Sequence, residues 1–177
     1  MTERVILVDE TDVEVGTEEK LAAHEAPGKL HRAISVFVFD TSGQMLLQRR
    51  SSAKHHFRGL WGNTACSHPR PGEETLAAGE RRLREEMGIE ASLEAVGWFI
   101  YFAEDLESAL VEHELDHVLV GVSDDDPRLD LREVDAFDRV DPGTLLDRLR
   151  ADETGFVPWL RVAMEAFPAL WDGTRTG

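Results

Sequence analysis

One segment constrains the fold more than any other part of the chain. Residues 73–89 read EETLAAGERRLREEMGI, with apolar side chains at helical spacing and Gly88 where a helix would need a C-terminal cap. The pattern predicts a helix over residues 74–87. Because residues four apart share a face of a helix, Arg82 and Glu86 should point the same way. The charged row taken alone is also typical of an exposed helix with weak salt bridges.

The other periodic segments predict a mixture of strands and helices. Runs of apolar, β-branched and aromatic residues predict strands at 5–8, 33–39, 45–48, 95–102 and 115–122. A turn sequence between the second and third strands indicates a hairpin. Helices are predicted at 21–24, 144–150 and 156–170, the first with Thr17 as its N-cap. Since strands and helices do not alternate regularly, we predict one α+β domain over residues 1–177, a mixed sheet flanked by helices.

The charge balance limits the partners. The chain has 35 Asp and Glu against 19 Lys and Arg, a formal net charge of −16, which repels nucleic-acid backbones and anionic membranes. We therefore expect no nucleic-acid or membrane partner, and a monomer or a weak dimer. An acidic protein with only three lysines is typical either of GC-rich codon usage or of a salt-loving source, and the sequence leaves both open.

Targeting signals are not evident in the sequence. The longest apolar runs, such as residues 34–39 and 118–122, are far shorter than the ~18 residues of a membrane span. The first ten residues, MTERVILVDE, lack the basic and apolar stretches of a secretory signal. One cysteine excludes an intramolecular disulfide and an all-cysteine metal site. We expect the protein to be cytoplasmic.

The only cysteine lies in a polar segment. Residues 62–69 read GNTACSHP, so Cys66 is two residues from His68 and just ahead of Pro-Arg-Pro-Gly. A lone cysteine is usually a small buried hydrophobe. The polar, turn-rich surroundings favour a loop position over a core position here.

A second polar segment carries paired carboxylates. Residues 111–117 read VEHELDH, and on a strand Glu112, Glu114 and Asp116 would face the same side. Two carboxylates at this spacing can converge on a metal ion, or they can simply form a charged sheet edge.

Histidines outside these two segments complete a candidate metal site. His24 and His31 are separated by Pro27-Gly28, and a folded loop could bring them together. With His68 and the two glutamates they would offer three nitrogens and two carboxylates, a set that suits Zn²⁺, Mn²⁺ or Fe²⁺. His55 and His56, beside Lys54 and Arg58, are expected at the surface or near a phosphate.

The helical segment at residues 73–89 resembles the Nudix signature, G-x5-E-x7-R-E-U-x-E-E-x-G-U. The matching residues are Glu73, Arg81, Leu83, Glu85, Glu86, Gly88 and Ile89. Ser67 stands at the leading glycine, and Arg82 stands where the hydrolases carry a glutamate that holds Mg²⁺. A guanidinium there removes an oxygen ligand and reverses the local charge. Diphosphate binding is expected to survive this change, whereas metal-assisted hydrolysis should suffer.

Three further blocks narrow the resemblance to one family. The blocks are NTACSHP at 63–69, EHELD at 112–116 and FVPW at 156–159. With the altered Nudix helix they resemble type 1 isopentenyl-diphosphate Δ-isomerase over residues 5–171. The family implies a Nudix-type α/β/α sandwich that isomerises isopentenyl diphosphate to dimethylallyl diphosphate for isoprenoid biosynthesis. Two alternatives remain: a Nudix hydrolase of a nucleoside diphosphate derivative, and a binding module without turnover.

The resemblance also implies roles for individual residues. Proton transfer through a carbocation-like intermediate is implied for Cys66 and Glu114 on opposite faces of the alkene, with Tyr101 near Glu114 and Trp159 against the cation. The implied ligands of a Mn²⁺ or Zn²⁺ ion are His24, His31, His68, Glu112 and Glu114. The implied diphosphate contacts are Lys20, Arg50, Lys54, Ser67 and Arg82. A Mg²⁺ ion arriving with the substrate is implied at Glu86 and the backbone carbonyl of Cys66. Tyr101 and Trp159 are also compatible with ordinary core aromatic positions.

Overall fold

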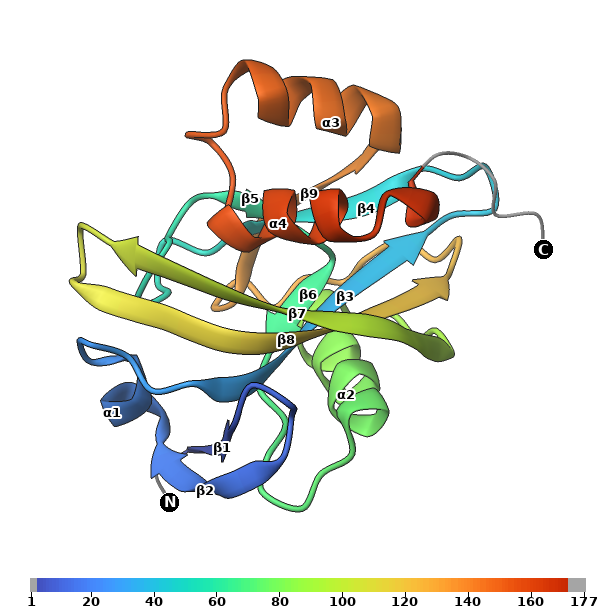
Figure 1. The fold of residues 1–177 in the computed structure, drawn as a ribbon. Helices are drawn as coiled ribbons and strands as arrows, with labels where there is room; N and C mark the ends of the chain where they lie inside the picture. Colours follow the sequence, from blue (N-terminus) through green and yellow to red (C-terminus); the bar gives the residue numbers. More distant parts are fainter. Residues whose placement is uncertain (1–2, 172–177) are drawn as a thin grey trace.

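A curled mixed sheet of nine strands is the frame of the molecule in the computed structural model, which describes residues 3–171 (Figure 1). The strands are β1 (Arg4–Val8), β2 (Glu14–Glu19), β3 (His31–Phe39), β4 (Met45–Arg50), β5 (Trp61–Gly62), β6 (Ala65–Ser67), β7 (Leu93–Asp105), β8 (Leu110–Val122) and β9 (Val134–Val140). The helices are α1 (Lys20–His24), α2 (Thr75–Met87), α3 (Pro142–Ala151) and α4 (Pro158–Ala166), followed by a 3-10 turn at Pro168–Leu170.

Strand β3 lies at the centre of the sheet. It runs parallel to β8 along its whole length and antiparallel to β6, while β8 forms a long hairpin with β7. Beyond β3 the sheet continues through β4, which pairs with β9. The mixture of one parallel pair with antiparallel pairs agrees with the absence of a regular strand–helix alternation in the sequence. The predicted hairpin of β3 and β4 is present, although its strands share a single paired position, Phe39 with Met45.

The apolar side chains of β3 alternate between two cores. Ile34, Val36 and Val38 pack with Leu83 and other residues of α2 on one face of the sheet. On the other face, Phe37 and Phe39 pack with residues of α3 and α4. A strand buried on both faces explains why residues 33–39 read as an almost continuous apolar run. The helices therefore cover both faces of the sheet (Figure 1), which confirms the predicted α+β arrangement of a mixed sheet flanked by helices.

Several boundaries differ from the sequence predictions for identifiable reasons. Thr17 does not cap a helix, because it pairs with Ile6 in the β1–β2 ladder; the cap of α1 is Glu19, whose carboxylate accepts a hydrogen bond from Ala22 N. The predicted helix over 156–170 is split. It breaks before Pro168, because a proline disfavours helical geometry in the preceding residue, and Phe167 has φ −125° and ψ 57°.

The predicted strands, and the helices that correspond to α1 and α3, are too short, whereas α2 begins one residue after its predicted start. Both β7 and β8 extend over 13 residues and begin before the predicted starts. The prediction that Cys66 occupies a loop is wrong, since it lies in β6 and pairs with Ser35 of β3. Among the described residues, no helix has the length and apolar character needed to cross a membrane. The predicted domain limits, residues 1 and 177, lie outside the described part of the chain.

Gly88 ends α2 in the left-handed conformation that the sequence predicts, with φ of 63°. The segment after β8 comes back against this end of the helix: Arg128 N donates to Met87 O at 2.7 Å, and Asp130 N to Glu86 O at 3.1 Å. A Cβ on Gly88 would lie 2.6 Å from the backbone oxygen of Arg128. The missing side chain therefore permits both the helix end and the close approach of the returning chain.

We predict that Gly88→Ala destabilises the fold more than left-handed strain alone would. That strain costs about 1–2 kcal/mol, and displacement of the Arg128 backbone adds to it. Gly43→Ala is the matched control, because Gly43 also has a positive φ of 85° but no atom lies within 4 Å of the added Cβ. The measurement is the free energy of unfolding in urea. Equal losses for the two variants would contradict the role of the Arg128 contact.

Candidate active site

Five buried side chains converge where a metal ion could be held: His24, His31, His68, Glu112 and Glu114. Their candidate ligand atoms all lie within 4.8 Å of one another. Glu114 Oε1 is 2.7 Å from His68 Nε2 and 3.5 Å from His31 Nε2. The structure thus brings together the five residues for which the sequence predicts a metal site.

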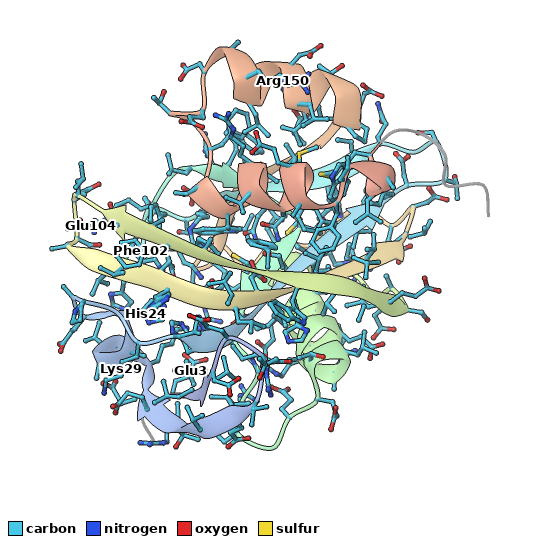
Figure 2. The ribbon with its side chains drawn as sticks, in the orientation of Figure 1. Glu3, His24, Lys29, Phe102, Glu104 and Arg150 are labelled. Carbon is cyan, nitrogen blue, oxygen red and sulfur yellow. The ribbon has the colours of Figure 1, made fainter. Side chains whose placement is uncertain are left out.

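The loop between α1 and β3 carries two of the imidazoles to β8. His24 ends α1, where that helix meets β8 (Figure 2). His31 begins β3. The β3–β8 register pairs His31 directly with Glu114. Gly28 allows the loop to pack closely on β8, because a Cβ at this position would lie 2.7 Å from Val111 Cγ1. The folded loop that the sequence requires between the two histidines is therefore present.

The carboxylates of β8 point into the molecule. Glu112, Glu114 and Asp116 are 3%, 6% and 1% exposed, as the period-two pattern predicts for one face. The alternative of a charged sheet edge is wrong, because β8 is paired with β3 on one side and with β7 on the other. Burial removes the hydration of these three carboxyl groups, so each of them needs a nearby positive charge, a hydrogen-bond donor or a proton of its own.

Backbone carbonyls orient two of the imidazoles. His24 Nδ1 is 2.7 Å from Lys20 O, and His31 Nδ1 is 2.7 Å from Lys29 O. A carbonyl oxygen only accepts, so each Nδ1 carries the proton and each Nε2 turns its lone pair towards the cluster. Such hydrogen bonds to the outer nitrogen are typical of metal-binding histidines.

The lone pairs in this cluster fit a cation. His31 Nε2 and His68 Nε2 face each other at 3.2 Å. Within residues 3–171, His24 Nε2 and Glu112 Oε2 are buried without a hydrogen-bond partner, although they lie only 3.1 Å apart. Converging lone pairs and carboxylates repel one another unless a positive charge lies between them. The donor set of nitrogen and carboxylate oxygen suits a divalent metal.

The local electrostatics favour the metal-binding protonation state at Glu114 and at His68, but not at His24. Burial opposes ionisation of Glu114, but the imidazole of His31 outweighs it and lowers the pKa of Glu114 to about 2. Burial, assisted by the charge of Lys20, lowers the pKa of His68 well below its usual range. Burial also acts on His24, but contact with Glu112 outweighs it and raises the pKa of His24. An ionised carboxylate and a neutral imidazole are the forms that bind metal.

Cys66 lies beside a buried arginine. Its Sγ accepts a hydrogen bond from Arg50 Nη1 at 3.3 Å, and Arg50 Nε donates to Phe57 O at 3.1 Å. The remaining nitrogen, Nη2, donates to His56 O at 3.1 Å. Burial raises the pKa of the Cys66 thiol to about 12, although Arg50 acts in the opposite direction. The sequence predicts Arg50 at the diphosphate, and the structure places its guanidinium against the thiol.

Tyr101 and Trp159 complete this part of the site. The Tyr101 hydroxyl donates to Glu114 Oε2 at 2.5 Å, and burial together with the charge of Glu114 raises the pKa of Tyr101 well above its usual range. Trp159 Nε1 donates to Asn63 Oδ1 at 3.0 Å, which fixes the indole ring. The guanidinium of Arg50 lies 5.4 Å from the centre of that ring. Both aromatic residues are buried, and both border the same cavity.

A cavity of about 300 Å³ joins these groups. Its lining includes most of the predicted site residues, namely Lys20, Arg50, Lys54, Cys66, Ser67, His68, Arg82, Tyr101, Glu112, Glu114 and Trp159. A single hollow therefore contacts a thiol, a carboxylate, an indole ring and several cations.

Three of the cations at this cavity are already paired with carboxylates. Lys20 Nζ is 3.1 Å from Glu3 Oε2, and Lys54 forms an ion pair with Glu133. Arg82 Nη2 is 3.3 Å from the same Glu133. An incoming anion would therefore compete with Glu3 and Glu133.

The α2 residues Arg82 and Glu86 face each other as their spacing predicts. Arg82 Nε donates to Glu86 Oε1 at 3.0 Å, and Gln48 Nε2 donates to Glu86 Oε2 at 2.7 Å. Glu86 is 1% exposed and lies outside the group of five ligand atoms. The charged row on α2 is therefore partly buried, and the interpretation as an ordinary exposed helix is wrong for these two residues.

Sequence reasoning missed four residues of this site. Glu3 and Glu133 come from distant parts of the chain, and no motif marks them. Asp116 shares the inward face of β8, a signal that the period-two pattern already contained; Ser35 Oγ donates to it at 2.7 Å, and burial, with the charge of Glu114, raises its pKa. His56, expected at the surface or near a phosphate, borders the cavity and contacts Glu112.

Comparison with known proteins gives one consistent result. A NUDIX domain model matches residues 29–160. Isopentenyl-diphosphate Delta-isomerase 1 of Aromatoleum aromaticum is 44% identical over 176 residues, which cover 99% of this chain and 98% of that protein. Isopentenyl-diphosphate Delta-isomerase of Nocardia farcinica is 46% identical over 167 residues, covering 94% and 95% of the two chains.

Solved structures agree on the fold. A Deinococcus radiodurans protein of known crystal structure superposes with a TM-score of 0.75, covering 93% of this chain and 99% of that chain. Its sequence is 22% identical, so this likeness concerns the fold alone.

The raised pKa of Cys66 predicts slow alkylation at neutral pH. A thiol with a pKa of about 12 is protonated at pH 7, and its reactive thiolate fraction rises about tenfold for each pH unit below the pKa. The rate of iodoacetamide modification should keep rising from pH 8 to pH 10, followed by mass spectrometry of the intact protein. Free cysteine is the control, because its rate levels off near its pKa of about 8.5. A plateau for Cys66 at the same pH would contradict the effect of burial.

Proposed function

The chain belongs to the isopentenyl-diphosphate Delta-isomerases of the NUDIX domain proteins, and from this premise we propose how its residues share the reaction. The enzyme isomerises isopentenyl diphosphate to dimethylallyl diphosphate in isoprenoid biosynthesis. An unactivated alkene must be protonated, and a proton must then leave the neighbouring carbon. The intermediate has the character of a tertiary carbocation, so the reacting carbons need a pocket that excludes water.

The observation that carries the proposal is the contrast between two groups on one cavity. Cys66 has a pKa of about 12 and holds its proton, whereas Glu114 has a pKa of about 2 and is ionised. Two titratable groups driven apart in this way are typical of an acid–base pair. We assign one proton transfer to each, on opposite faces of the alkene, in line with the family resemblance.

Two aromatic residues assist this pair. The Tyr101 hydroxyl donates a hydrogen bond to Glu114 Oε2 and so holds the carboxylate in place. The proton of this hydroxyl is also available for transfer to Glu114. Trp159 presents a fixed indole ring at the cavity, and the face of an indole stabilises a neighbouring cation by up to about 2 kcal/mol when desolvated.

The diphosphate is assigned to the cations around the cavity. Lys20, Lys54 and Arg82 would exchange Glu3 and Glu133 for phosphate oxygens. Ser67 also borders the cavity and can donate from its hydroxyl. Arg50 contributes positive charge from its position beside Cys66.

Two divalent ions are proposed. Mn²⁺ or Zn²⁺ suits the group of three imidazoles and two carboxylates, and when bound it would orient Glu114 and favour its ionised form. Mg²⁺ would accompany the diphosphate, held by Glu86 and the carbonyl of Cys66. Rotation of Arg82 from Glu86 to the substrate would free Glu86 Oε1 for this purpose.

The remaining properties follow from composition. We propose a cytoplasmic protein, since its single cysteine is free and takes part in the chemistry. A monomer or weak dimer that binds no nucleic acid or membrane is consistent with the charge of −16.

The direct test is to incubate the purified protein with isopentenyl diphosphate and Mg²⁺ and to detect the allylic isomer by NMR. Elemental analysis of the active protein identifies the metal in the histidine site. Release of inorganic phosphate or of a nucleoside monophosphate would instead favour the hydrolase. That alternative has less support, because Arg82 occupies the position of a metal-holding carboxylate.

We predict that Cys66→Ala and Glu114→Gln each reduce turnover by about 10²–10⁴, the usual contribution of a positioned acid or base. Cys66→Ala should leave the affinity for the diphosphate nearly unchanged, because the thiol does not bear charge at pH 7. Glu114→Gln also touches the metal group, so metal content must be measured together with the rate. A Cys66→Ala protein that isomerises at near the wild-type rate would end this mechanism.

We predict that Arg82→Glu chiefly raises KM. Loss of a charge-assisted contact of about 2–3 kcal/mol corresponds to a factor of about 30 to over 100. Arg84→Glu is the matched control, since it makes the same charge change on an exposed position of α2. Steady-state kinetics of both variants decide the matter. Equal KM values for Arg82→Glu and wild type would remove Arg82 from the diphosphate site.

A further inference from the structure

The two carboxylate oxygens of Glu112 have different neighbours. Oε2 is 3.1 Å from Nε2 of His24, which is one of the five candidate metal ligands. Oε1 is 2.5 Å from His56 Nε2, and the His56 side chain is only 14% exposed. The imidazole of His56 therefore contacts the carboxylate oxygen of Glu112 that His24 does not.

His56 reaches this position on a loop that is fixed at several points. The loop follows β4 and ends at β5. His56 O accepts from Arg50 Nη2, and the next amide, Phe57 N, donates to Asp105 Oδ2 at 3.1 Å. Phe57 adopts a left-handed φ of 49°, and its ring meets the Trp159 ring edge to face at 5.5 Å. Contacts on both sides of His56 thus decide where its imidazole lies.

His56 borders the cavity, where its imidazole contacts the carboxylate of Glu112. Within residues 3–171 its Nδ1 is buried without a hydrogen-bond partner, so the ring interacts with Glu112 through Nε2 alone. It lies outside the group of five ligand atoms, although its ring centre is 5.3 Å from that of His24. This arrangement places it behind a ligand and not among the ligands.

We propose that His56 is a positioning residue for the metal site, and this inference rests on the proposed metal-binding role of Glu112. His56 N–H fixes Oε1, so that Glu112 offers Oε2 alone as a ligand. Without this contact the carboxylate of Glu112 is free to rotate. Oε1 can then turn towards the metal, or both oxygens can turn away from it. Groups that orient ligands in this way typically change metal affinity by about 10- to 100-fold when removed.

The test measures metal binding by the full-length apoprotein, with Mn²⁺ and Zn²⁺ as probes and a chromophoric chelator as competitor. His56→Ala and His56→Phe should each weaken binding by about 10- to 100-fold. His56→Gln keeps an N–H donor and should recover most of the affinity. The matched control is His55→Ala, the exposed neighbour, which should bind metal like the wild type. The absorption spectrum of the Co²⁺-loaded protein should change in His56→Ala and His56→Phe but not in His55→Ala.

The outcomes separate this inference from the metal site itself. Wild-type affinity and an unchanged Co²⁺ spectrum in His56→Phe, while Glu112→Ala loses the metal, would overturn the role of His56 and leave the proposed function intact. Failure of the wild-type apoprotein to bind either ion would overturn the metal site, and the positioning role with it. His56→Phe fills the space of the ring, so it decides the question even where circular dichroism finds His56→Ala unfolded.

Discussion

Two carboxylate groups buried beside each other on one strand determine how the elements around them must meet. An ionised carboxylate loses several kcal/mol of hydration on burial unless cations or hydrogen-bond donors replace the water. Glu112 and Glu114 are almost fully buried, and their partners are imidazoles from α1, from β3 and from the segment after β6. These elements are far apart in the chain, so the sheet has to bring all of them to β8.

Strand β3 makes this arrangement possible because it joins the two cores. Its side chains pack alternately against α2 and against the layer of α3 and α4. The register of its parallel pairing with β8 places Glu114 directly opposite His31. The cavity then takes different chemistry from each layer. The α2 side supplies Arg82, whereas α4 supplies the indole ring of Trp159. A charged end and an apolar end of the substrate site thus arise from the two faces of one sheet.

The sequence predicted those features that depend on local spacing. The shared inward face of Glu112 and Glu114 follows from strand periodicity, and the end of α2 follows from Gly88. The chemistry of the residues suggested the three histidines, although spacing alone only permitted a loop between His24 and His31, and the family resemblance implied the same ligand set. Features set by distant contacts were not predictable in this way. The sequence predicts Thr17 as a cap because its pairing with β1 is not visible locally, and it predicts His56 at the surface or near a phosphate because the contact with Glu112 joins residues 56 positions apart.

The ion pairs around the cavity have a consequence for the form in which substrate enters. Three of the four cations assigned to the diphosphate are already paired with carboxylates, Lys20 with Glu3, and Lys54 and Arg82 with Glu133, whereas Arg50 contacts the thiol of Cys66. A bare anion that displaced these carboxylates would leave them uncompensated inside an acidic protein. An anion that arrives with its own divalent counterion restores electroneutrality in one event, since the released carboxylates then face a positive charge. The pocket is therefore matched to a neutral salt complex, and its affinity should depend on ionic strength less steeply than that of an open basic groove.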